Sequence, residues 1–154
     1  MKICLAGTSA ITDENKDEIK NVRYILESFY SIKEWQIPYI KKADLFLLDS
    51  GAFTMFSKGH NLTEKDWDDY VTKYIDFINK YDVKYFFELD VDRILGIKKV
   101  EEIRNRLEKE TGKKCIPVWH KERGWKYFEN LQKHGVECEL KRLIDNSFIS
   151  PDVG

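Results

Sequence analysis

A chain of 154 residues with 42% hydrophobic and 14% aromatic side chains has the length and composition of a single globular domain, which excludes a disordered chain. Its 26 basic and 27 acidic residues leave a formal net charge of −1, so overall charge gives no basis for tight non-specific binding to nucleic acid or to an anionic membrane. The three cysteines have no CxxC spacing and favour neither a disulfide framework nor a zinc site; without a secretory signal or an apolar span, we expect a cytoplasmic protein.

The first half of the chain predicts two strands, each followed by a helix. The short apolar run of residues 2–7 predicts the first strand, and apolar residues at three- and four-residue steps over residues 16–30 predict a helix after it. Residues 45–48 form an unbroken apolar run, typical of a strand buried on both faces. Thr63 then precedes residues 64–82, whose helical period makes this segment the clearest predicted helix.

The second half repeats the alternation. Residues 84–89 predict the third strand, and apolar residues at helical spacing over 100–107 predict the next helix, with Gly112 as its stop. Residues 115–119 predict the fourth strand, and residues 125–131 predict the fourth helix. Strands that alternate with helices in this way are expected to be parallel and joined by right-handed crossovers.

The predicted fold class is therefore α/β, with four parallel βα units that make half of a (β/α)₈ TIM-type barrel. These units occupy a domain of residues 1–135, and residues 136–154 are a divergent, mixed polar tail that is too short to supply the other four units. Apolar strands left as bare edges favour completion of the sheet by a second copy, as a homodimer, or by a partner. A small open α/β sheet and a shortened version of a longer protein are the alternatives.

Reactive side chains follow three of the predicted strands. Because the carboxyl ends of parallel strands meet at one edge of a sheet, we expect these side chains to converge there. They are Asp49, Ser50, Glu88, Asp90, Asp92 and His120. The two-residue period of a strand places Glu88, Asp90 and Asp92 on one side, where three carboxylates would crowd. In the alternative interpretation, Asp49 caps a turn in which Gly51 supplies a positive φ, and His120 is a satisfied histidine at the edge.

Four segments carry a resemblance to a known family: LESFYSIK (Leu26–Lys33), LDSGAFT (Leu48–Thr54), FFELDVDRILG (Phe86–Gly96) and IPVWHKERG (Ile116–Gly124). In order and spacing, the chain over roughly residues 1–133 resembles the queuine tRNA-ribosyltransferase-like superfamily. The likeness is closest to the phage and bacterial DNA 7-deazaguanine transglycosylases. Such proteins are (β/α)₈ barrels that exchange a purine base in nucleic acid for a 7-deazaguanine, through a covalent aspartyl intermediate.

The resemblance implies roles for individual residues. Asp49 and Asp90 would be the catalytic residues, and the purine or 7-deazaguanine base would be bound by Ser50, Gly51, Phe53, Glu88, Asp92, His120 and Arg123. It implies no cofactor and no metal ion, and DNA or tRNA would bind through a local patch. In the family pattern, Ala52 replaces a common glycine and Thr54 replaces a common glutamine. The zinc-binding cysteines of the tRNA enzymes are absent, and so is the second half of the barrel that carries the nucleophilic aspartate.

Three functions therefore remain open. The first is a truncated transglycosylase-like protein that binds a purine-type base or nucleotide and contributes to base exchange, a glycosyltransferase reaction. The second is a non-catalytic, phage-derived binding or inhibitor protein that uses the half-barrel as a scaffold. The third is a metal-dependent hydrolase with oxygen and nitrogen ligands from Asp49, Glu88, Asp90, Asp92 and His120.

Overall fold

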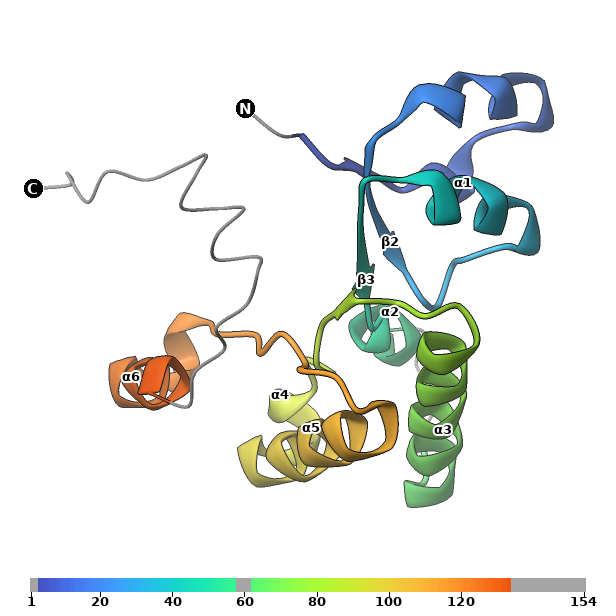
Figure 1. The fold of residues 1–154 in the computed structure, drawn as a ribbon. Helices are drawn as coiled ribbons and strands as arrows, with labels where there is room; N and C mark the ends of the chain where they lie inside the picture. The colour runs from blue at the N-terminus through green and yellow to red at the C-terminus, as the bar shows by residue number, and fades with distance from the viewer. Residues whose placement is uncertain (1–2, 58–61, 134–154) are drawn as a thin grey trace, which may run out of the picture. The chain divides into compact units, whose positions relative to one another are not determined.

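Four strands pair in the order in which they occur along the chain in the computed structural model, which describes residues 3–57 and 62–133. They are β1 (Leu5–Ala6), β2 (Tyr24–Ser28), β3 (Leu45–Asp49) and β4 (Tyr85–Phe86). Every pair is parallel, and Figure 1 shows β2 beside β3. The predicted α/β class with parallel strands is therefore confirmed.

Helices occupy the connections between the strands. The elements before β3 are η1 (Thr8–Ala10), η2 (Asp13–Asn21), η3 (Glu34–Gln36) and α1 (Ile37–Lys42), where η denotes a 3₁₀ helix. The elements after β3 are α2 (Ala52–Ser57), α3 (Glu64–Lys80), α4 (Asp92–Leu95) and α5 (Ile97–Thr111). None of the helices in the described ranges is both long and apolar enough to span a membrane.

The chain divides into two compact units. Residues 4–118 form the larger unit, which contains the sheet, and residues 119–133 belong to the second. In the second unit, η4 (Lys121–Arg123) precedes α6 (Trp125–Lys133), which confirms the fourth predicted helix. The predicted tail of residues 136–154 lies outside the described residues, so the domain limits of 1–135 and 136–154 stay a prediction.

The helix α3 forms where the sequence predicts it, because its start and its buried face are both encoded locally. The Thr63 hydroxyl accepts a hydrogen bond from the Asp66 amide (3.3 Å), and the Asp66 carboxylate accepts one from the Thr63 amide (2.7 Å). The buried side of α3 joins Leu48 of β3 and Phe86 of β4 in the main hydrophobic core. This packing places α3 directly against the ends of the two strands.

The prediction of a helix over residues 16–30 is wrong after Asn21, because only its first part is helical, in η2. In the structure η2 ends at Asn21 and the strand β2 follows, hydrogen-bonded to β1 on one side and to β3 on the other. Ile25 and Glu27 are each 1% exposed, so burial in β2 follows the two-residue period of a strand. The apolar residues that suggested one helical face belong to different elements.

The fourth predicted strand, residues 115–119, is reduced to one bridge between Phe87 and Ile116. The Ile116 amide donates to the Phe86 carbonyl (2.8 Å), and its carbonyl accepts from the Glu88 amide (2.9 Å). The next residue, Pro117, has no amide hydrogen to offer to a further strand. The ladder is therefore short at this edge.

Candidate functional site

The strand β3 ends in a tight turn formed by Asp49, Ser50 and Gly51. The Gly51 amide donates a hydrogen bond to Asp49 Oδ2 (2.9 Å), and the Gly51 carbonyl accepts one from the Met55 amide (3.1 Å) at the start of α2. Within the described residues, Asp49 Oδ1 accepts no hydrogen bond. Asp49 therefore caps the turn, as the simpler interpretation predicted, and uses only one of its two oxygens to do so.

Gly51 fits this turn because no side chain would. Its φ is +67°, and a Cβ atom here would overlap Ser28 Oγ and would lie 2.6 Å from Tyr30 Cβ and 3.0 Å from the Tyr30 amide nitrogen. Ser28 is the last residue of β2 and pairs with Asp49 in the sheet register. The turn after β3 is therefore packed tightly against the end of β2.

Two tyrosines of α3 support the strand ends. The Tyr70 hydroxyl donates to the Ser50 carbonyl (2.5 Å), and the Tyr74 hydroxyl lies within hydrogen-bond distance of the carbonyls of Leu48 (3.2 Å) and Phe87 (3.0 Å). Burial, and with a smaller effect the charge of Asp49, raises the pKa of both hydroxyls. Both tyrosines therefore stay protonated hydrogen-bond donors at neutral pH.

Glu88 is buried and paired with an arginine, which the sequence did not predict. It is 1% exposed, its Oε2 pairs with Arg104 Nη1 of α5 (3.2 Å), and its Oε1 accepts from the Val118 amide (3.0 Å). The expectation that Glu88, Asp90 and Asp92 share one side of a strand is wrong, because β4 ends at Phe86 and Asp92 begins α4. A metal site that includes Glu88 would compete with Arg104 for its carboxylate.

The other predicted site residues divide between the two units. Asp90 follows β4 and Asp49 ends β3, so both lie at the carboxyl-end edge of these parallel neighbours. Phe53 lies on α2 and is 70% exposed. His120 and Arg123 belong to the second unit, where His120 Nδ1 lies 2.9 Å from a carboxylate oxygen of Glu122. A functional role for these residues stays a prediction.

A buried polar cluster near the ends of β1 and β2 was not predicted from the sequence. The Thr8 hydroxyl donates to Glu27 Oε1 (2.5 Å) and accepts from Gln36 Nε2 (2.7 Å), and all three residues are at most 2% exposed. This cluster ties the segment after β1 to the segment after β2. The sequence carries one signal for this cluster, because Glu27 lies two residues after Ile25 in an otherwise apolar segment. This spacing fits one face of a strand better than one face of a helix.

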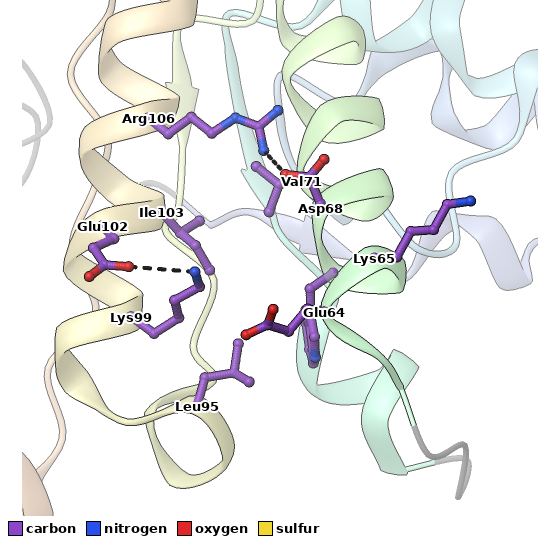
Figure 2. A pocket seen from close by; sticks show the side chains of 10 residues that line it. Glu64, Lys65, Asp68, Val71, Leu95, Lys99, Glu102, Ile103 and Arg106 are labelled. Carbon is purple, nitrogen blue, oxygen red and sulfur yellow. Dashed lines mark hydrogen bonds and ion pairs between the residues drawn. The ribbon is translucent and has the colours of Figure 1, made fainter.

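A hollow of about 580 Å³ lies between α3 and α5 (Figure 2). Its walls carry equal numbers of acidic and basic residues. Arg106 of α5 forms an ion pair with Asp68 of α3 across the hollow (2.6 Å), and Lys99 pairs with Glu102 on its own helix (3.5 Å). Because these four charges already have partners of opposite sign, the hollow is a weaker candidate for a ligand site than the end of β3.

In comparisons with known proteins, no family model, no curated protein and no solved structure matches this chain. The candidate site is therefore defined by the geometry around Asp49. This geometry offers a carboxylate of which one oxygen accepts no hydrogen bond from the part of the chain that the structure describes, held by a tight turn at the carboxyl end of a parallel strand. A carboxylate in this arrangement accepts hydrogen bonds from N–H groups of a ligand.

Proposed function

We propose that this protein binds a purine-type base or nucleotide at the carboxyl-end edge of its parallel sheet, as a shortened relative of the deazaguanine transglycosylases. The observation that carries the proposal is the Asp49 carboxylate, whose Oδ2 is fixed by Gly51 while Oδ1 accepts no hydrogen bond from the described residues. Ligands of open parallel α/β proteins bind at this edge of the sheet. By the resemblance in the LDSGAFT segment, Asp49 takes the position of an aspartate that handles protons or holds the incoming base.

The chemistry of a guanine-type base suits these groups. Its ring N–H and exocyclic amine are hydrogen-bond donors, which a carboxylate can accept. Phe53 lies four residues after Asp49 and is 70% exposed, and an exposed aromatic ring offers a surface on which a base can stack. Asp49 would supply recognition of the base edge, and Phe53 would supply apolar contact with its face.

Base exchange would require the groups that the transglycosylases carry in the second half of their barrel. In this proposal a second copy of the chain, or a partner, completes the half-barrel. The consecutive strand order β1-β2-β3-β4 supports this idea, because it is the order of neighbouring strands in such a barrel. Exchange of labelled guanine into DNA and into tRNA, measured with the purified protein, would distinguish a base-exchange enzyme from a non-catalytic binding protein.

Asp49→Asn is expected to weaken the binding of guanine or 7-deazaguanine about tenfold or more, because the charged acceptor is lost. The variant should keep nearly the same melting temperature, because the amide oxygen can still accept from Gly51 and the residue is not part of the core. Isothermal titration calorimetry measures the affinity, and thermal unfolding measures the stability. A large fall in melting temperature with unchanged affinity would contradict the proposal.

The protein is expected to be a dimer or larger in solution. The strand β1 pairs only with β2 among the described strands, and its Leu5 side chain is 40% exposed, so this edge is open to another strand. Light scattering at micromolar concentration should give at least twice the chain mass of 18.3 kDa. A single species with the mass of one chain would show that the sheet is not completed by a second copy.

A further inference from the structure

One peptide group links α3 to the candidate base-binding carboxylate. The Ser50 carbonyl and the Gly51 amide belong to the same planar peptide, so they point in opposite directions. The carbonyl accepts from the Tyr70 hydroxyl (2.5 Å), and the amide donates to Asp49 Oδ2 (2.9 Å). We propose that Tyr70 is a positioning residue, which orients the Asp49 carboxylate by fixing this peptide. The inference rests on the proposed function for the identity of the ligand.

The turn needs such a contact because glycine lets the peptide rotate. A glycine at φ +67° has access to conformations that other residues avoid, so a flip of the preceding peptide has little steric cost at Gly51 itself. A flip would turn the amide away from Asp49 and would leave the buried Ser50 carbonyl without the Tyr70 hydroxyl. The hydroxyl therefore favours the one orientation that holds the carboxylate.

Tyr70 is itself held in place. It is 9% exposed, lies on the buried side of α3, and packs edge-on against the Phe29 ring with 5.4 Å between centroids. Burial raises the pKa of its hydroxyl above the ordinary value, and the nearby Asp49 and Tyr30 raise it further. The group thus remains a donor to the Ser50 carbonyl at the pH values at which the protein would work.

Tyr70→Phe removes this hydroxyl and keeps the ring. With guanine as the probe in isothermal titration calorimetry, the variant is expected to bind about three- to tenfold more weakly, the effect of one lost hydrogen bond. In Tyr70→Phe/Asp49→Asn, the two losses should be less than additive, because Tyr70 acts through Asp49. Tyr74→Phe is the matched control: it removes a buried hydroxyl one turn later on α3 that contacts the carbonyls of Leu48 and Phe87 and not the Ser50 peptide.

Amide hydrogen exchange of Gly51, followed by NMR on the protein without ligand, tests the positioning role separately. Tyr70→Phe should speed this exchange severalfold, and Tyr74→Phe should change it less. If the wild-type protein binds no purine but Gly51 exchanges faster in Tyr70→Phe, the proposed function fails and the positioning role stands. If the wild type binds guanine, an equal affinity of Tyr70→Phe or fully additive losses in the double variant would overturn the inference. Unchanged Gly51 exchange in Tyr70→Phe would overturn it whether or not guanine binds.

Discussion

Replacement of Gly51 by alanine is expected to destabilise the fold by about 3 kcal/mol and to lower the melting temperature by about 10 °C. Two costs combine. A non-glycine residue at φ +67° is strained, and the new methyl group would lie 2.6 Å from Tyr30 Cβ and 3.0 Å from the Tyr30 amide nitrogen. Because the second of these atoms is backbone, relief requires the segments after β2 and β3 to move apart. Thermal and urea unfolding measure the loss.

Gly112→Ala is the matched control for this prediction. Gly112 caps α5 with nearly the same backbone angle, φ +68°, but a Cβ atom added to it would meet nothing within 4 Å. Gly112→Ala should therefore lower the free energy of unfolding only by the cost of the strained backbone angle, about 1 kcal/mol. Equal losses at Gly51 and Gly112 would contradict the close packing of the turn against Ser28 and Tyr30.

Arg104→Met should cost about 3 kcal/mol of unfolding free energy, because it removes the Arg104 cation from the buried Glu88 carboxylate. The side chain of Glu88 is fully buried, whereas that of Arg104 is 16% exposed, and their charged groups lie 3.2 Å apart. Glu88 also accepts from the Val118 amide (3.0 Å), so the pair joins α5 to the segments after β4 and after the Ile116 bridge. Urea unfolding at constant pH and salt measures the cost.

A second arginine of α5 provides the comparison. Arg106 contacts Asp68, Thr72 and Glu110, but its side chain is 31% exposed and its carboxylate partners are more exposed still. Arg106→Met should therefore cost less than about 1 kcal/mol. Glu88→Gln in the Arg104→Met background should recover part of the stability by removing the buried charge. No recovery, or equal losses at the two arginines, would show that Glu88 and Arg104 do not form a buried pair.

The parts of the structure that could be predicted from sequence depend on neighbouring residues. Thr63, Asp66 and the apolar period after them contain both the start and the buried face of α3, and residues 45–48 contain the whole apolar run of β3. The turn after β3 is predictable for the same reason, because its hydrogen bond joins Asp49 and Gly51, which are two residues apart. The strand β2 was mistaken for a helix because its pairing partners, β1 and β3, lie elsewhere in the chain.

By itself, the sequence determined the α/β alternation, the clearest helix and the position of Asp49 at the end of a strand. Only the tertiary structure decided that Tyr70 holds the Ser50 carbonyl, 20 residues away, and that Arg104 neutralises Glu88, 16 residues away. Such contacts join different secondary elements, so they depend on how α3 and α5 pack against the sheet. No local period or spacing encodes that packing, because it is set by which buried faces meet.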